Sequence, residues 1–238
     1  MNYFFITGTS SGIGFALANE ILKNENNYII GFSRNNNISH QRYEHINLDL
    51  SKPEIVKNYK FIDIIDAESV TLINNSGVIG DVKHIGNIDN NSIISTFNVN
   101  SISPAILINN FIKTYKNFSG KKIIINISSG AARHAIESWS SYCASKSALD
   151  MFSLVAKADS DKKLYGFKIF SIAPGIVDTN MQNQIRETDK NDFSLLNTFV
   201  QYKNDNLLEK PQYTANQLVK IIKNPEKYNN VILDLREI

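Results

Sequence analysis

Seven short apolar runs recur along the chain, and longer segments with helical periodicity separate them. Most of these runs are almost continuously apolar, which is typical of strands buried on both faces of a parallel sheet. The runs cover residues 3–7, 28–33, 44–48, 70–74, 121–128, 168–173 and 231–235. Their alternation with helical segments predicts an α/β fold, in which one doubly wound parallel sheet of seven strands carries helices on both faces.

Helices are predicted at 13–22, 93–115, 141–158 and 213–223, where apolar residues recur at helical spacing. Ser51 and Glu54 have the spacing of a capping box, with Pro53 in the first turn, and predict one more helix there. The chain has no evident linker or repeat, so we expect a single domain over 1–238. Segment 176–211 is polar with spaced apolar residues and follows a strand end, which predicts a lid over a site.

Composition excludes several classes of function. Lys plus Arg (25) nearly balance Asp plus Glu (23), which argues against a large nucleic-acid interface but leaves room for a local phosphate site. The single cysteine, Cys143, excludes an internal disulfide framework and a CxxC motif. The four histidines lack metal-ligand spacing, so we expect no metal. No apolar window reaches 18 residues and the first residues lack a basic leader, which predicts no membrane span and a cytoplasmic location.

A glycine-rich turn follows the first predicted strand and opens the first predicted helix. Its sequence is Thr7-Gly8-Thr9-Ser10-Ser11-Gly12-Ile13-Gly14. Gly8 allows a tight turn, Gly12 lets backbone amides approach a pyrophosphate, and Gly14 permits close packing of helix on strand. Most glycine clusters are simple turns, but this one has the strand before it and the helix after it that dinucleotide binding requires. The turn predicts a Rossmann-like domain.

A second motif places a phenol, an ammonium and a hydroxyl within reach of one another. Tyr142 and Lys146 are four residues apart, so they share one face of the predicted helix, and Ser129 lies thirteen residues before Tyr142 at a strand end. A lysine beside a phenol lowers the pKa of the phenol, as a general acid for a carbonyl oxygen needs. Alone, the Tyr–Lys pair is more often an ordinary pair on a solvated helix face.

Together these motifs resemble those of the short-chain dehydrogenase/reductase family over essentially the whole chain. Further matches are Asn74-Asn75-Ser76-Gly77, Asn98-Val99-Asn100-Ser101 and Pro174-Gly175-Ile176-Val177-Asp178-Thr179. The resemblance implies a catalytic set of Asn100, Ser129, Tyr142 and Lys146, with Asn100 holding a water next to Lys146. It also implies a homodimer through the two long helices at 93–115 and 141–158. Ser76 stands where the family has alanine.

The end of the second predicted strand bears on the choice of cofactor. It carries Ser33, Arg34 and Asn35 and has no acidic residue to bind a ribose 2′-hydroxyl, whereas Arg34 can pair with a 2′-phosphate. We therefore expect NADPH/NADP+. Asp49 matches the family position that meets the adenine amine. The full set expected at the cofactor is Gly8, Ser10, Ser11, Gly12, Ile13, Gly14, Ser33, Arg34, Asn35, Asp49, Leu50, Asn75, Ser76, Gly77, Tyr142, Lys146, Pro174, Gly175, Val177 and Thr179.

Residues that flank the motifs bear on the substrate. Trp139, Met181 and Asp234 lie in segments that resemble sepiapterin reductase and the bacterial benzil reductases. Asp234 falls where sepiapterin reductases carry the aspartate that holds the pterin, although it equally fits the ordinary polar end of a last strand. The resemblance implies an NADPH-dependent carbonyl reductase of a small ketone or diketone. Alternatives are a sepiapterin reductase and, in a different class, a sensor or scaffold that binds the dinucleotide without chemistry.

Overall fold

The computed structural model describes residues 1–238 and contains one seven-stranded, entirely parallel sheet with the order β3-β2-β1-β4-β5-β6-β7. The strands are β1 (Asn2–Thr7), β2 (Asn27–Ser33), β3 (Tyr43–Asn47), β4 (Ser69–Asn74), β5 (Lys121–Ile127), β6 (Phe167–Ala173) and β7 (Ile232–Asp234). The predicted fold class and all seven predicted strands are confirmed, since each observed boundary lies within one residue of the expected one.

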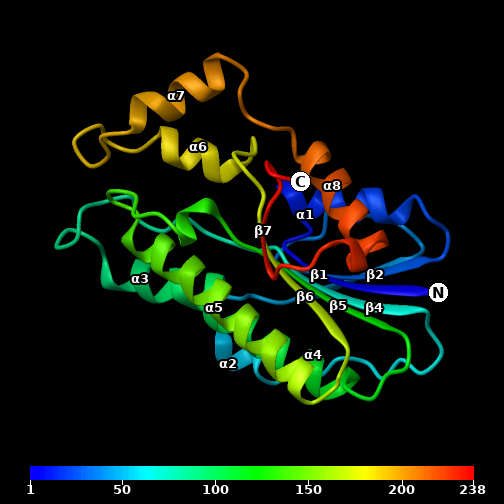
Figure 1. The fold of residues 1–238 in the computed structure, drawn as a ribbon. Coiled ribbons are helices and arrows are strands. Elements are labelled where there is room, and N and C mark those ends of the chain that lie inside the picture. The colour runs from blue at the N-terminus through cyan, green and yellow to red at the C-terminus, as the bar shows by residue number, and fades with distance from the viewer.

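Helices cover both faces of the sheet (Figure 1). α1 (Gly12–Leu22) and α8 (Pro211–Lys223) pack on one face, while α2 (Pro53–Val56), α4 (Ser103–Tyr115) and α5 (Ser140–Lys162) pack on the other. Successive strand residues point to opposite faces, so Phe4 and Ile6 enter the core under α1 and α8, and Phe5 enters the core under α4 and α5. This double burial explains why the strands are apolar throughout.

Two helix predictions need correction. The helix expected over 93–115 is α3 (Asn90–Phe97), one π-helical turn (Asn98–Ile102) and then α4, and it begins earlier because Asp89 accepts the Asn91 amide at 3.0 Å. The prediction of a capping box at Ser51 is wrong, although the short helix expected there does form as α2. Lys52 precedes α2 without a side-chain cap, and the Ser51 hydroxyl donates instead to Asp49 Oδ1 at 2.8 Å.

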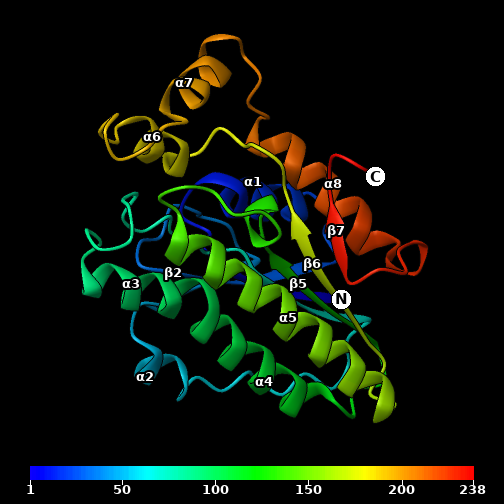
Figure 2. The ribbon, with the colours of Figure 1, turned by 60° about the vertical axis from the view of Figure 1, so that its left-hand side comes forward.

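Segment 176–211 folds into α6 (Asn180–Arg186) and α7 (Leu196–Asn204), which stand beyond the carboxyl ends of the strands (Figures 1 and 2). Their apolar side chains form a third core with residues near the start of α5, separate from the two cores against the sheet. Short 3₁₀ turns occupy Gly130–Ala132 and Pro225–Lys227. None of the helices has both the length and the apolar character needed to span a bilayer.

The strand order reverses at β1, whose neighbours are β2 on one side and β4 on the other. In doubly wound sheets, ligands bind outside the carboxyl ends of the strands at such a reversal. The segments that follow β1, β4, β5 and β6 carry the predicted motifs, so the fold brings them to one edge of the sheet.

Candidate active site

The glycine-rich turn has the backbone that its sequence predicts. Gly8 and Gly12 have φ of 75° and 57°, a region that favours glycine. A Cβ on Gly14 would lie 2.3 Å from the carbonyl oxygen of Gly8, so no side chain fits there. Ser11 precedes α1 without capping it, which leaves the amides of the first helical turn available to an anion. The turn therefore fits the pyrophosphate of a dinucleotide.

The segment after β4 holds this turn in place. Asn75 Nδ2 donates to the carbonyl oxygens of Thr7 at 2.9 Å and of Gly8 at 3.3 Å. The amides of Asn75 and Ser76 both donate to Thr7 Oγ1, at 2.9 and 3.0 Å. These bonds fix the Gly8 carbonyl against Gly14. Thr7 thus belongs to the support of the site, although the sequence offered no motif that marked its hydroxyl.

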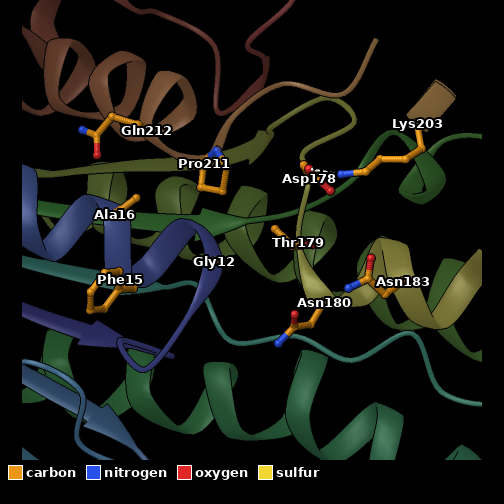
Figure 3. Close-up of a pocket in the computed structure, with 10 residues that line it drawn as sticks. All are labelled: Gly12, Phe15, Ala16, Asp178, Thr179, Asn180, Asn183, Lys203, Pro211 and Gln212. Carbon is orange, nitrogen blue, oxygen red and sulfur yellow. Dashed lines mark hydrogen bonds and ion pairs between the residues drawn. The ribbon is translucent and has the colours of Figure 1, made fainter. Parts of the chain in front are cut away.

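A cavity of about 520 Å³ lies between the start of α1, the start of α6 and the end of α7 (Figure 3). Thr179 reaches across toward the turn, and a Cβ on Gly12 would lie 3.4 Å from its Cγ2. The Asp178 carboxylate and the Lys203 ammonium, 2.6 Å apart, join the loop after β6 to α7. The loop after β6 and the glycine turn therefore form two sides of one space. The other residues expected at the cofactor follow strand ends along the same edge: Ser10, Ile13, Leu50, Gly77, Pro174 and Val177.

At the end of β2, Arg34 and Asn35 are exposed, and the Arg34 side chain bonds to no other residue. The Ser33 hydroxyl, by contrast, already donates to the Asn35 carbonyl oxygen at 2.7 Å and lies 3.2 Å from His45 Nε2. Burial acts to raise the pKa of the Asp49 carboxyl, but hydrogen bonds from Ser51 and the nearby Arg34 guanidinium leave it below its ordinary value. The Arg34 guanidinium at the end of β2 is therefore free to bind an anion.

Ser129, Tyr142 and Lys146 converge at the carboxyl end of β5. Tyr142 and Lys146 are 7% and 3% exposed, and the Lys146 ammonium lies 5.8 Å from the centre of the Tyr142 ring. Lys146 Nζ donates to the Ile127 carbonyl oxygen at 2.7 Å, which anchors the lysine to β5 just before Ser129. Ser129 also stands at the start of a 3₁₀ turn, where its Oγ accepts the Ala131 amide at 3.1 Å.

Burial shifts the pKa values of the Tyr142 phenol and the Lys146 ammonium in opposite directions. It raises the pKa of the Tyr142 phenol, and the side-chain hydrogen bond with Ser129 offsets this only in part. Burial also lowers the pKa of Lys146 to about 8, against the opposing effect of the Asp150 carboxylate. The expectation that Lys146 lowers the pKa of Tyr142 is therefore not met in this structure, because removal of the phenol from water outweighs its neighbours.

Asn100 lies in the π-helical turn between α3 and α4, and such turns are frequent at functional sites. It is fully buried. Its amide donates to the Val78 carbonyl oxygen at 2.8 Å and to Ser145 Oγ at 3.0 Å, while its Oδ1 accepts the Val78 amide. A Cβ on Gly77 would lie 3.5 Å from Asn100 Oδ1 and 3.4 Å from Lys146 Nζ, so both atoms border the space beside Gly77. Asn98 instead donates to the Ser51 carbonyl oxygen and points elsewhere.

An aromatic wall covers Tyr142. Trp139 is 6% exposed and meets the Tyr142 ring edge-on with centroids 5.6 Å apart. It also packs on Phe193 and Phe199 of the 176–211 segment, at 5.6 and 5.4 Å between centroids. Met181 packs against the same cluster. Trp139 and Met181 therefore belong to the cluster that packs around Tyr142, and their contact with a substrate stays a prediction.

Asp234 does not offer a free carboxylate. It is 4% exposed, and its Oδ1 accepts the amide and Nε of Arg236 at 3.0 and 2.9 Å, while Oδ2 accepts Nη2 at 2.6 Å. The hydrogen bonds from Arg236 hold the pKa of Asp234 below its ordinary value. The carboxylate that the sequence suggested for a pterin is thus already engaged within the chain.

Other residues at the site escaped the sequence analysis. Ser145 links Asn100 to the helix by donating to the Tyr142 carbonyl oxygen at 2.9 Å. Asp150, buried one turn after Lys146, accepts the Ser171 hydroxyl at 2.6 Å and lies 3.6 Å from Arg133 Nε. Spacing along α5 from Tyr142 and Lys146 could have indicated both. No sequence pattern pointed to Arg236.

Fold and site together define a nicotinamide-dependent oxidoreductase. The chain belongs to the short-chain dehydrogenase family, whose model, described as short chain dehydrogenase, matches residues 2–190. It is 34% identical over 242 residues to a benzil reductase ((S)-benzoin forming) of Bacillus cereus, an alignment that covers 95% of this chain and 96% of the relative. The predicted resemblance to this family is confirmed.

Two further comparisons define how far the likeness extends. The chain is 35% identical over 124 residues to a sepiapterin reductase of Rattus norvegicus, which covers 51% of this chain and 46% of that protein. The crystal structure of a short-chain dehydrogenase/reductase from Saccharomyces cerevisiae superposes with a TM-score of 0.82 at 23% identity, covering 98% of this chain and 96% of that one. The second comparison shows a shared fold.

Proposed function

We propose that this chain is an NADPH-dependent carbonyl reductase that reduces a ketone or diketone to an alcohol or hydroxyketone. The observation that carries the proposal is the convergence of Ser129, Tyr142 and Lys146 under an aromatic wall, beside a glycine turn that fits a pyrophosphate. The likeness to a benzil reductase along nearly the whole chain supports it.

When bound, a reduced nicotinamide supplies the hydride. In this proposal Ser129 binds the substrate carbonyl oxygen and aligns it, and Tyr142 gives that oxygen its phenolic proton. Lys146 holds the ribose hydroxyls, and the hydrogen bond with Ser129 is the contact that favours loss of the proton from Tyr142. Asn100 Oδ1 and Lys146 Nζ border the same space beside Gly77, where a water between them would resupply the proton from solvent. Segment 176–211 acts as the lid that excludes bulk water.

Arg34 carries the preference for NADPH over NADH. We expect Arg34→Ala to weaken NADPH binding about 10- to 100-fold, because only NADPH brings a 2′-phosphate to the guanidinium. NADH binding stays within about twofold. Titration of both cofactors by protein fluorescence measures this. Lys52→Ala is the matched control, since Lys52 is also a cation beside Asp49 and has no assigned phosphate. Equal losses for both cofactors remove Arg34 from the site.

The reaction separates this proposal from its alternatives. Loss of NADPH absorbance with a panel of aromatic diketones supports the carbonyl reductase. Turnover of sepiapterin alone supports the pterin reductase, which the partial match to the rat enzyme favours. Cofactor binding without turnover across the panel supports a sensor or scaffold.

We also propose a homodimer through α4 and α5. Exposed apolar side chains in the single chain are Ile102, in the π-helical turn directly before α4, and Met151, Phe152, Leu154 and Val155 on α5. Burying them against a second copy would remove this apolar surface from water. Light scattering of the purified protein is expected to give about twice the 26.8 kDa chain mass, and Met151→Glu with Val155→Glu to give one chain. A wild-type monomer contradicts this interface.

A further inference from the structure

The C-terminal tail brings a guanidinium to the carboxyl edge of the sheet. β7 ends at Asp234, at the edge where the parallel strands β5 and β6 also end, and the C-terminal tail continues beyond it (Figure 2). A Cβ on Gly175 would lie 3.5 Å from Cγ and Cδ of Arg236, and a Cβ on Gly130 would lie 3.8 Å from its Nη2. Gly130 directly follows Ser129, so the guanidinium lies beside the loop of the serine assigned to the carbonyl oxygen.

Asp234 fixes the orientation of this guanidinium. Arg236 Nε donates to Oδ1 at 2.9 Å and Nη2 donates to Oδ2 at 2.6 Å, which is a bidentate pair with a buried carboxylate. The backbone amide of Arg236 donates to the same carboxylate at 3.0 Å. A side chain held by two parallel bonds loses little further freedom when a ligand binds it.

The ion pair leaves donors unused. A guanidinium has five N–H groups, and this pair engages only two of them. Arg236 Nη1 donates to no atom of the chain, and 62% of the side chain is exposed. The wall that covers Tyr142 is aromatic, formed by Trp139, Phe193 and Phe199. Beside the loop of Ser129 the tail therefore presents unused N–H donors, while its own carboxylate, Asp234, is already paired, a combination that suits a ligand with oxygen acceptors.

We propose that Arg236 positions the substrate by donating a hydrogen bond to a second carbonyl oxygen, adjacent to the one that Ser129 and Tyr142 hold. Arg236 thereby favours 1,2-diketones over monoketones of the same shape. This inference rests on the proposed carbonyl reductase function and names its substrate class. Arg236 also disfavours pterins. Their N–H donors would need the Asp234 carboxylate, both of whose oxygens already accept hydrogen bonds from Arg236.

The test compares benzil with deoxybenzoin, which has the same two phenyl rings but a methylene in place of one carbonyl. With Arg236→Gln we expect kcat/KM for benzil to fall about 10-fold or more, mainly through KM, and kcat/KM for deoxybenzoin to change less than twofold. Arg236→Lys retains one charged donor and restores part of the loss on benzil. The control Lys168→Gln, on β6, removes an ion pair with Glu226 and is expected to leave kcat/KM for both ketones unchanged.

Arg236→Gln leaves a buried carboxylate unpaired, so the double variant Asp234→Asn/Arg236→Gln is measured beside it. Selective loss on benzil in both variants supports the inference. Equal loss on both ketones, or no loss on either while the wild type reduces benzil, overturns the role of Arg236 and leaves the proposed function intact. A wild type that binds NADPH but reduces no ketone overturns both.

Discussion

Replacing Tyr142 with phenylalanine is expected to lower kcat by about 10²- to 10⁴-fold, the range that a positioned general acid contributes. Phenylalanine keeps the ring that packs edge-on against Trp139, so the shape of the site is preserved and only the proton donor is lost. NADPH binding is expected to stay within about twofold. Single-turnover reduction of a diketone, with NADPH absorbance as the measured quantity, isolates the chemical step.

The pH dependence provides the matching control. In the wild type the rate is expected to depend on the protonation of the Tyr142 phenol. This pH dependence is expected to disappear in Tyr142→Phe. Cys143→Ala, a change on the next residue of the same helix, is expected to keep wild-type turnover. Near wild-type single-turnover rates in Tyr142→Phe would show that another group protonates the carbonyl oxygen.

Lys146→Met is expected to abolish turnover and at the same time to stabilise the protein without its cofactor. Burial lowers the pKa of Lys146 to about 8, below the 10.5 of a free lysine, so the folded chain holds the charge at a cost. That difference corresponds to about 3 kcal/mol at pH 7. Loss of the hydrogen bond to the Ile127 carbonyl oxygen offsets about 1 kcal/mol of the gain. The net increase in unfolding free energy is about 2 kcal/mol.

The pH dependence of this stability has a defined sign. Between pH 8 and 10.5 the unfolded wild type binds more protons at Lys146 than the folded one, so wild-type stability rises with pH. The advantage of Lys146→Met is therefore greatest below pH 8 and shrinks above it. Urea unfolding from pH 7 to 10 measures this. Lys122→Met is the control, because Lys122 also donates to a backbone carbonyl but is only partly buried. A less stable Lys146→Met at pH 7 contradicts the expected cost of the charge.

The sequence predicted the elements whose cause is local. Strands buried on both faces are apolar throughout, and this marked all seven to within one residue. Gly14 and the Tyr142–Lys146 pair could be placed because backbone approach and helical spacing are short-range properties. The Ser51 capping box failed because Asp49, two residues earlier, competes for the serine hydroxyl. The direction of the Tyr142 pKa depends on burial under Trp139 and the 176–211 segment, which no local pattern encodes.

Asp234 is a second residue whose role the sequence alone could not predict. Its position at the end of the last strand was predicted, but its availability depends on where Arg236 folds back, two residues later. The Arg236 side chain can fold back in this way because Gly130, after β5, and Gly175, after β6, have no side chains in the space that it occupies. Residues 130 and 175 are far from the tail in sequence, so only the assembled sheet edge reveals the contact.

The aromatic wall over Tyr142 has a consequence for which molecules the protein selects. In the closed arrangement the phenol is 7% exposed, and Trp139 stacks on Phe193. We expect a ligand that reaches Tyr142 to separate these rings, so that its apparent affinity is the intrinsic affinity scaled by the fraction of molecules in which they are apart. A ligand with its own aryl rings replaces the lost stacking, whereas a small aliphatic ketone does not. We therefore expect the wall to favour aryl ketones over small aliphatic ketones before any proton or hydride moves.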